Sequence, residues 1–591
     1  MAARDRLGLG EALRTRWYIG LRAGLSVGVP LAAGVAAGRP SWGALASMGG
    51  FAGFYGPDTP YPYRIRLVAG VGLALTVVVP LSSLCAPVAW LSVLLCGAVA
   101  GAGAFVCLAL RVPPPREYLI VLATLAATGI PAGGLAPLRD CALVAAGAVT
   151  GGLISLAPAL GGRRAPVESK AVTAAWRAVH EVLGTAGTPG AAHARAHAVA
   201  AAGQARDALR QAGTAAADDR LRSLAAAELA LAGALSASID AAAPLDAASV
   251  RRVLAPAEAV RDGKETVIGL DQPGTAARLR AALGPDSVAV PAAARIAVTV
   301  AAGAALGRAL GLEHSYWVAL TAAAALQANN VTFLVRRSLN RLAGTIAGIG
   351  IAWLVFTAHP VPAVVAVMAT ACQFAGEVLI KGSYGLAMVF VTVVALSVYD
   401  LGVPQARIGT AVGARVLDTA IGVALVIALR LLLWRRAAGS RLPPVQARAL
   451  RAAADVFRAR WLGPAAGDLV PARRRLEEDL LRMHTLTDDA MADAVFGSRD
   501  TSAEQVTLAV DELAMLALGI PFGRPRPPGG EAAALITRLD ELTAALRNGA
   551  SPPDSPAIAL HLPGYPRTVA AAQLLAAAMS GRSAPGARRP H

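Results

Sequence analysis

Five polar residues beside long apolar runs have the side chains that bind a carboxylate. Gln327, Asn329 and Asn330 close one such run, and Arg341 stands in the short basic turn that follows it. Arg66 stands after an apolar run in the first part of the chain. Amides hydrogen-bond a carboxylate, and a guanidinium also pairs with its charge. These residues are candidates for binding an anionic substrate, while arginines so placed also serve as topology anchors and amides as helix caps.

One acidic residue lies deep inside an apolar stretch. Asp418 is ten positions into the run 408–434, which in a helix places it about 15 Å from the start. A carboxylate at that depth is costly and by default indicates a function, such as coupling transport to protons. Arg415 lies one helical turn earlier and can pair with Asp418. A coupling role and a neutralised pair that locks helix packing both remain open for these two residues.

The chain shows no pattern for enzyme or metal chemistry. It contains no H-E-x-x-H and no dinucleotide-binding fingerprint. His193 and His197 are four residues apart and could share a helix face, but no cysteine or carboxylate completes a metal site. The five cysteines form no C-x-x-C pair. We therefore predict a protein that is not an enzyme and that holds no metal and no cofactor.

The composition indicates that much of the chain lies in lipid. Of its 591 residues, 55% are hydrophobic and only 16% are charged, and the mean hydropathy is +0.53. Soluble domains have about 25% charged residues. Many of the arginines behind the net charge of +17 stand in short turns between apolar runs, which is the distribution that the positive-inside rule produces. This distribution favours a lipid bilayer as the partner and argues against nucleic acid.

Twelve apolar runs are candidate membrane spans. The first half contains 18–37, 41–56, 66–85, 87–110, 117–135 and 138–160. The second half contains 288–309, 315–335, 340–358, 360–380, 383–400 and 408–434. Lysine and arginine are concentrated in the turns after spans two, four, eight and ten, which places both termini and the middle region in the cytoplasm. Because each half has an even number of spans, we predict two parallel six-helix repeats.

The two halves also share a local pattern. Trp42 and Trp317 each begin a W-x-A-L segment, and an arginine follows each at the same distance, since 66 − 42 = 24 and 341 − 317 = 24. A shared spacing of this length indicates an internal repeat. Tyr316 beside Trp317 is typical of an aromatic pair at a membrane interface. Gly344 and Gly348 have the small-xxx-small spacing that lets two helices pack closely in lipid.

Polar regions flank and separate the membrane halves, and together they define an all-α polytopic membrane protein. Amphipathic spacing predicts helices in two cytoplasmic regions, and a Pro-, Ser-, Gly- and Arg-rich composition predicts a poorly ordered tail. The predicted parts are a cytoplasmic N-terminus at 1–17, transmembrane repeats at 18–160 and 288–436, cytoplasmic helical regions at 161–287 and 437–548, and the tail at 549–591.

These features resemble the fusaric acid resistance protein family, also called the integral membrane bound transporter family. The resemblance rests on the YWVALT segment at 316–321, on Arg337 and Arg341 ahead of the Gly-Thr-Ile-Ala-Gly segment at 344–348, and on the stretch 384–392. The first half departs from this pattern, because Arg66 is kept but Ala-Gly replaces the Gly-Thr that follows it.

The resemblance implies an integral plasma-membrane transporter that exports small organic anions, with aromatic carboxylic acids as the leading substrate class. Two other functions remain open. One is a passive anion channel of the same fold, and the other is a membrane scaffold, without transport activity, whose cytoplasmic helices bind partners. The sequence also leaves a homo-oligomer open.

Overall fold

The computed structural model shows a helical chain. Its described residues form α-helices and short 3-10 helices joined by loops, with no strand among them. The structure describes residues 9–129, 136–159, 167–213, 218–241, 243–263, 274–284, 287, 289–312, 315–325, 331–402, 408–433, 442–463, 469–493, 501–520, 525–550, 552, 562 and 564–581.

The chain divides into two compact units, each built from two separate stretches of sequence. The membrane unit comprises Met1–Arg164 and Gln272–Trp434, and the helical unit comprises Ala165–Asp271 and Arg435–His591. The two cytoplasmic helical regions expected from the sequence therefore lie in one unit. Local sequence patterns do not report contacts between segments so far apart, which is why they were predicted as separate regions.

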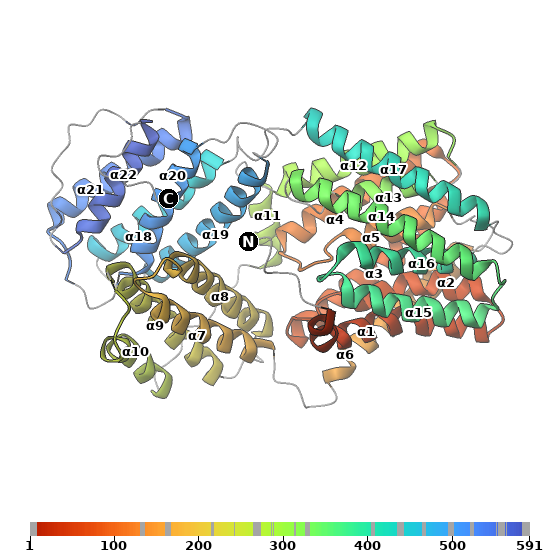
Figure 1. The fold of residues 1–591 in the computed structure, drawn as a ribbon, viewed down its shortest axis with the longest axis horizontal. Helices are drawn as coiled ribbons and strands as arrows, with labels where there is room; N and C mark the ends of the chain where they lie inside the picture. The colour runs from red at the N-terminus through yellow and green to blue at the C-terminus, as the bar shows by residue number, and fades with distance from the viewer. Residues whose placement is uncertain are drawn as a thin grey trace. The chain divides into compact units, whose positions relative to one another are not determined.

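The membrane unit contains two sets of six α-helices (Figure 1). The first set is α1 (Leu9–Ala36), α2 (Pro40–Gly50), α3 (Tyr61–Cys85), α4 (Ala89–Ala109), α5 (Tyr118–Ala127) and α6 (Ala136–Leu156). The second set is α12 (Ala289–Ala309), α13 (Tyr316–Ala325), α14 (Val331–Phe356), α15 (Pro362–Leu379), α16 (Tyr384–Gly402) and α17 (Ile408–Leu433). Short helices η1 (Phe51–Phe54), η2 (Ala157–Ala159) and α11 (Thr275–Ala282) complete the unit.

Within the described part of the chain, nine helices are long and apolar enough to cross a membrane. Eight are in the membrane unit, namely α1, α3, α4, α6, α12, α14, α15 and α16. The ninth is α9 (Asp218–Asp240) of the helical unit, whose apolar residues pack into that unit's own core. A polytopic helical membrane protein is thus confirmed, whereas the arrangement of twelve spans in two repeats is not.

Three helices of the membrane unit are short in the structure. The described helices α2, α5 and α13 have 11, 10 and 10 residues. At 1.5 Å per residue they reach about 15–17 Å, roughly half of a 30 Å hydrocarbon core. The apolar runs predicted as full spans at these places therefore include residues outside the described helices.

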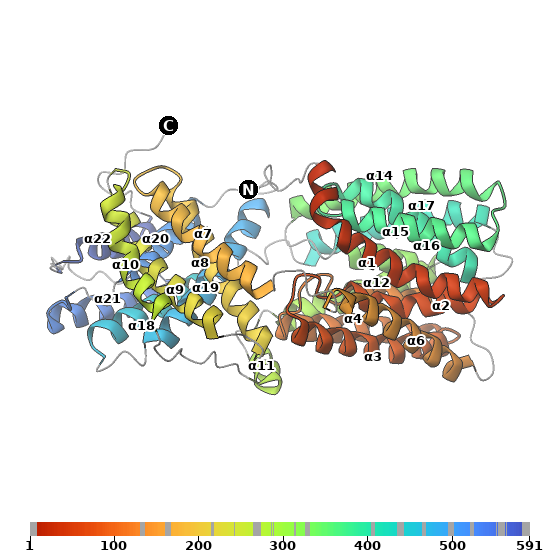
Figure 2. The ribbon, with the colours of Figure 1, turned by 90° about the horizontal axis from the view of Figure 1, so that it is seen from below.

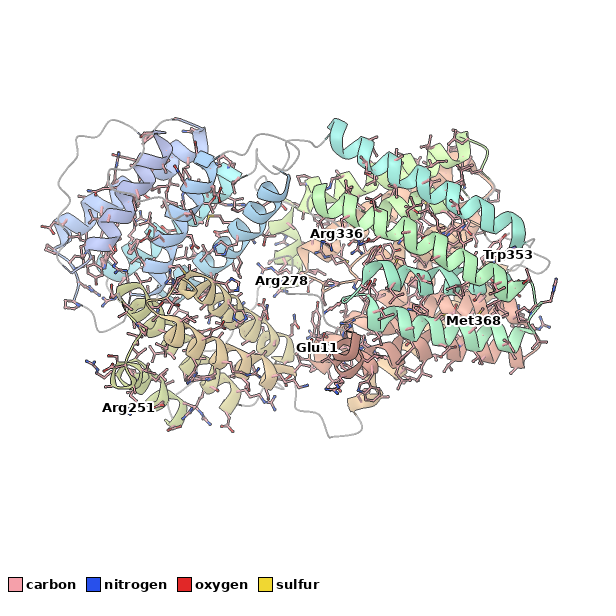
Figure 3. All side chains as sticks on the ribbon, viewed as in Figure 1. Glu11, Arg251, Arg278, Arg336, Trp353 and Met368 are labelled. Carbon is pink, nitrogen blue, oxygen red and sulfur yellow. The ribbon has the colours of Figure 1, made fainter. Side chains whose placement is uncertain are left out.

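Apolar side chains are exposed along the long helices of the membrane unit. Leu73 on α3 and Leu153 on α6 are each 67% exposed, and Val367 on α15 is 70% exposed. Trp353 lies toward one end of α14 in Figure 3 and is 55% exposed, while Arg336 lies toward the other end of this helix. Large apolar side chains exposed in this number on one unit indicate contact with lipid.

The two sets of helices pack in matching pairs. Helix α1 packs against α15, and α12 packs against α4, so that each set presents its first helix to the fourth helix of the other. Within the sets α2 packs on α6 and α13 on α17, and across them α2 contacts α16 and α13 contacts α5. Figures 1 and 2 both show α1 beside α15. Every contact named here for one set has a counterpart in the other.

Glycines let two of these helices approach closely. A Cβ atom on Gly348 of α14 would lie 2.5 Å from the carbonyl oxygen of Val389 on α16. A Cβ atom on Gly344 would meet the carbonyl oxygen of Gly385, also on α16. The small-xxx-small pair noted in the sequence thus lies at the α14–α16 contact, where a side chain has no room.

Replacing Gly348 with leucine is expected to destabilise the membrane unit by about 1–3 kcal/mol, because the new side chain must push α14 away from α16. The measurement is the temperature at which the purified full-length protein in detergent loses its monodisperse chromatographic peak. Gly350→Leu is the matched control on the same helix, since a Cβ there meets no atom within 4 Å. If this temperature falls equally in the two variants, the α14–α16 contact at Gly348 does not contribute to stability.

Both segments of the helical unit build its main core. Its helices are α7 (Val167–Thr185), α8 (Ala191–Ala212), α9, α10 (Ala247–Asp262), α18 (Leu442–Trp461), α19 (Leu469–Asp493), α20 (Thr501–Leu518), α21 (Gly529–Asn548) and α22 (Pro566–Met579). Val182 and Leu235 of the first segment share a buried cluster with Phe457 and Leu513 of the second. Leu575 of α22 is buried in the same cluster. The poorly ordered tail predicted at 549–591 is therefore wrong for α22, because this core buries its apolar face.

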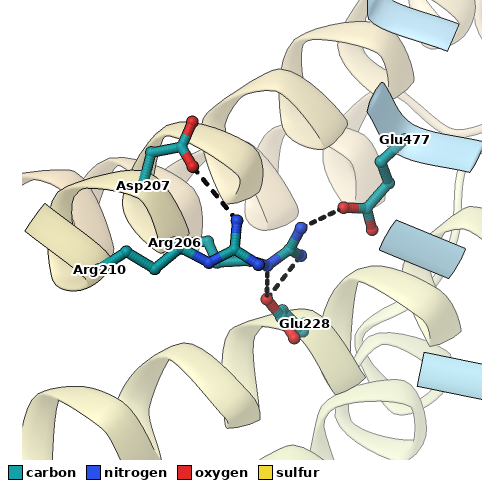
Figure 4. A network of polar contacts seen from close by, with 5 residues as sticks. All are labelled: Arg206, Asp207, Arg210, Glu228 and Glu477. Carbon is teal, nitrogen blue, oxygen red and sulfur yellow. Dashed lines mark hydrogen bonds and ion pairs between the residues drawn. The ribbon is translucent and has the colours of Figure 1, made fainter. Parts of the chain in front are cut away.

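A buried ion-pair network joins the two segments of the helical unit (Figure 4). The guanidinium of Arg206 on α8 lies 2.6 Å from Glu228 on α9 and 2.5 Å from Glu477 on α19. Burial alone would lower the pKa of Arg206, but the two carboxylates more than compensate and raise it, so the guanidinium stays charged. Removing one partner of such a network leaves a buried charge without compensation.

Candidate functional site

A cavity of about 810 Å³ lies inside the membrane unit. Helices α2 and α5 of the first set and α13 and α16 of the second contribute to its walls. One face of α16 lines it throughout, through Tyr384, Met388, Val391, Val394, Ala395, Val398, Tyr399 and Gly402. From Tyr384 to Gly402 this face extends about 27 Å at 1.5 Å per residue, close to the roughly 30 Å thickness of a hydrocarbon core.

Basic side chains outnumber acidic ones in the cavity wall. The basic residues are Arg16, Arg116, Arg139, Arg295, Arg337, Arg341, Lys381 and Arg415. The acidic residues are Asp58, Glu117, Asp140 and Glu377. Among the described residues of the wall, eight basic side chains against four acidic ones leave a surplus of positive charge. A cleft that is lined by charges of one sign and has low-dielectric walls concentrates ions of the opposite charge. In this cavity those ions are anions.

Three of the four acidic residues are engaged with partners away from the buried arginines of α14 and α17. Glu377 on α15 pairs with Arg16 of α1 at 3.6 Å between Oε1 and Nη2. Asp140 pairs with its neighbour Arg139 at 3.0 Å. Asp58 accepts a hydrogen bond of 3.0 Å from a tyrosine hydroxyl. These carboxylates therefore do little to neutralise the rest of the cavity.

Two of the arginines lie over the faces of aromatic rings. The guanidinium carbon of Arg415 lies 3.0 Å from the ring centroid of Trp317, and that of Arg337 lies 4.0 Å from the centroid of Tyr384. Tyr316 stacks on Trp317 with ring centroids 5.0 Å apart. A cation over an aromatic face is attracted by the ring quadrupole. The cavity thus offers flat apolar surfaces next to fixed positive charges.

Arg341 is a buried cation of the cavity, as the sequence-based proposal of an anion site requires. It is 4% exposed, and its Nη1 donates to the hydroxyl of Tyr384 at 3.4 Å and to the sulfur of Met388 at 3.4 Å. The Tyr118 hydroxyl also interacts with it. No described carboxylate pairs with Arg341, and its Nε has no hydrogen-bond partner.

Arg415 and Asp418 do not form the ion pair that their spacing allows. Arg415 instead lies on the face of Trp317, because its helix α17 packs against α13 and the ring occupies the space beside it. Asp418 is fully buried, and neither of its carboxylate oxygens has a hydrogen-bond partner. Arg415 lines the cavity, whereas Asp418 does not.

The structure separates Arg66 from the cavity. Arg66 is exposed, and its Nε donates to the backbone oxygen of Pro62 at 3.1 Å. Helix α3 begins at Tyr61, so Arg66 lies in its second turn, whereas Arg341 lies about three turns into the described part of α14. The equal spacing from the two tryptophans therefore does not give equal positions, and Arg66 as a substrate-binding residue is not supported by its placement.

The three amides of the predicted site, Gln327, Asn329 and Asn330, lie outside the described residues. They stay predictions from the sequence. His197, one of the two histidines spaced four residues apart, has its Nδ1 3.0 Å from Glu181. Among the described residues, no group of three or more histidine, cysteine, aspartate or glutamate side chains could hold a metal ion.

Sequence reasoning missed the aromatic walls of the site. It interpreted Tyr316 and Trp317 as interface anchors, but they are 8% and 6% exposed and line the cavity. The signal that could have revealed them is the repeat itself. Trp42, the counterpart of Trp317, also lines the cavity, with the guanidinium carbons of Arg39 and Arg139 at 4.3 Å and 5.9 Å from its ring centroid. Both halves place arginine beside this tryptophan.

The fold and the site define a polytopic helical membrane protein with a basic, aromatic-lined cavity between two sets of helices. Residues 300–429 match the family model described as fusaric acid resistance protein-like, so the resemblance predicted from the sequence is confirmed for this stretch. The matched stretch contains Trp317, Arg341, Arg415 and Asp418. The first half of the chain lies outside it.

A relative from Bacillus subtilis (strain 168) bears the name uncharacterized membrane protein YvaC. It is 24% identical to this chain over 528 residues, which are 82% of each protein. No solved structure matches the chain. The similarity to YvaC extends over both halves and supports a membrane protein of the same overall organisation.

Proposed function

We propose that this protein transports small organic anions across the plasma membrane and that the cavity of the membrane unit is their binding site. The observation that carries the proposal is the cavity's surplus of basic side chains, together with the face of α16 that lines it from end to end. A low-dielectric site with buried guanidinium groups binds carboxylates far better than cations or neutral molecules.

Aromatic carboxylates are the substrate class that we favour. The Tyr316–Trp317 stack offers a flat apolar surface, and Arg341 offers a buried cation without a protein carboxylate. An aromatic acid can meet both at once, with its ring on the stack and its carboxylate on the guanidinium. Gln327, Asn329 and Asn330 remain candidates for further contacts, on sequence evidence alone.

We also propose that the two sets of six helices are parallel repeats with both termini in the cytoplasm. The matching pairs α1–α15 and α12–α4 support this arrangement, since two copies of one bundle related by a two-fold axis produce such reciprocal contacts. The cavity then lies between the copies, where many transporters bind their substrates.

Coupling to protons is the proposed role of Asp418. A fully buried carboxylate without a hydrogen-bond partner is much more stable when protonated. It can therefore gain and lose a proton as the surrounding helices open to one side or the other. This favours a coupled exporter over a passive channel, which needs no such group.

The test is flux of radiolabelled benzoate in proteoliposomes, with and without a pH gradient, corrected with protein-free vesicles for leakage of the neutral acid. We expect saturable benzoate flux that the gradient drives, and none of benzamide, which has the same ring but no charge. Equal movement of benzoate and benzamide, or no protein-dependent movement of either, would overturn the proposal. If neither compound moves, the protein is better explained as a membrane scaffold without transport activity.

A further inference from the structure

Arg341 and Arg415 enter the same cavity from different helices, α14 and α17. They are 4% and 3% exposed, so both guanidinium groups are removed from water. Both belong to the wall of one cavity, together with Tyr118. Two like charges held near each other in a poorly solvated place are costly unless an opposite charge lies between or beside them.

No described carboxylate is in hydrogen-bond or ion-pair contact with either arginine, although the charge of Asp418 acts on Arg415 from the same helix. Glu377 is paired with Arg16. Asp58 and Glu117 are the carboxylates of the cavity wall that have no ion pair among the described residues, and two carboxylates cannot neutralise the basic surplus of the wall.

Both guanidinium groups contain buried nitrogen atoms that have no hydrogen-bond partner. Arg415 has one face on the Trp317 ring, and its Nε and Nη1 have no hydrogen-bond partner. Arg341 uses Nη1 toward Tyr384 and Met388, and its Nε has no hydrogen-bond partner. Each guanidinium therefore keeps hydrogen-bond donors for an oxyanion, and each is held in place by its neighbours.

We propose that Arg341 and Arg415 form a two-cation subsite that selects organic anions with two acidic groups over those with one. A dianion neutralises both buried guanidinium groups, whereas a monoanion leaves one without a counter-charge. This inference rests on the proposed function, because it specifies the substrate class of the same cavity.

The experiment is isothermal titration calorimetry on the purified full-length protein in detergent at neutral pH, with isophthalate, benzoate and isophthalamide as ligands. Isophthalate should bind at least about 10-fold more tightly than benzoate, since each close pair of opposite charges is worth about 1.5 kcal/mol or more. Isophthalamide, which keeps the shape and loses both charges, should not bind measurably.

Variants then assign the preference to the two arginines. Arg415→Gln and Arg341→Gln should each abolish the preference for isophthalate, while Arg415→Lys, which keeps the charge, should retain part of it and control for folding. Arg66→Gln, outside the cavity, should behave as the unmodified protein. Equal affinities for isophthalate and benzoate in the unmodified protein, or an unchanged preference in Arg415→Gln, would overturn this inference alone. Absence of binding by both anions would overturn the proposed function as well.

Discussion

Arg341→Ala is expected to abolish most carboxylate transport, with a loss of about 30-fold to several thousand-fold. We expect this loss because Arg341 forms a buried, hydrogen-bonded charge pair with the bound anion. Removing one member of such a pair costs about 2–5 kcal/mol. No described protein carboxylate pairs with Arg341, so the variant leaves no orphaned negative charge behind. The measurement is the initial rate of benzoate flux in proteoliposomes.

Two further variants separate the anion contact from general damage. Arg341→Lys keeps the charge but loses the planar fork of the guanidinium, so its flux should lie between those of Arg341→Ala and the unmodified protein. Arg66→Ala removes an exposed arginine outside the cavity and should leave flux unchanged. If Arg341→Ala transports benzoate as fast as the unmodified protein does, Arg341 is a structural residue and the cavity needs another anion-binding group.

Asp418→Asn is expected to remove the response of transport to a pH gradient while sparing flux of the anion down its own gradient. Asparagine has nearly the same shape as a protonated aspartate but cannot release a proton. Because both carboxylate oxygens of Asp418 are buried without a partner, the neutral form should be the resting form, and the substitution should be well tolerated by the fold. The measurement is accumulation of benzoate against its gradient when a pH difference is imposed.

Asp400→Asn is the control for the Asp418 experiment. Asp400 is a half-buried carboxylate near the end of α16 that does not line the cavity, and its loss should not affect coupling. Full stimulation by the pH gradient in Asp418→Asn would exclude proton coupling through this residue. A passive channel predicts that outcome, because nothing in it has to cycle between two protonation states.

The features that the sequence predicted correctly are local ones. Hydropathy and the low share of charged residues predicted a polytopic helical protein, since lipid demands long apolar helices. Gly344 and Gly348 predicted a close helix contact, because small residues at this spacing let two helix backbones approach each other in lipid. The choice of Arg341 as a substrate-binding residue stays a prediction, and the structure places this side chain in the cavity wall.

The failures concern positions that depend on contacts between distant segments. Arg66 matched Arg341 in spacing but not in place, because helix α3 begins later relative to Trp42 than α14 does relative to Trp317. Arg415 was assigned to Asp418 by helical spacing, yet the ring of Trp317 from another helix is its partner. The main core of the helical unit likewise depends on pairing residues that are hundreds of positions apart.

The central claim is that the cavity between the two sets of helices binds anions along the face of α16 that lines it. Single cysteines placed along α16, in a background without the five native cysteines, test this most directly with a membrane-impermeant thiol reagent. We expect Met388→Cys, Ala395→Cys and Tyr399→Cys to react and to be protected by bound benzoate. Leu386→Cys, on the exposed apolar face, should be unreactive in lipid. Reaction at position 386 with none at 388, 395 and 399 would contradict the account.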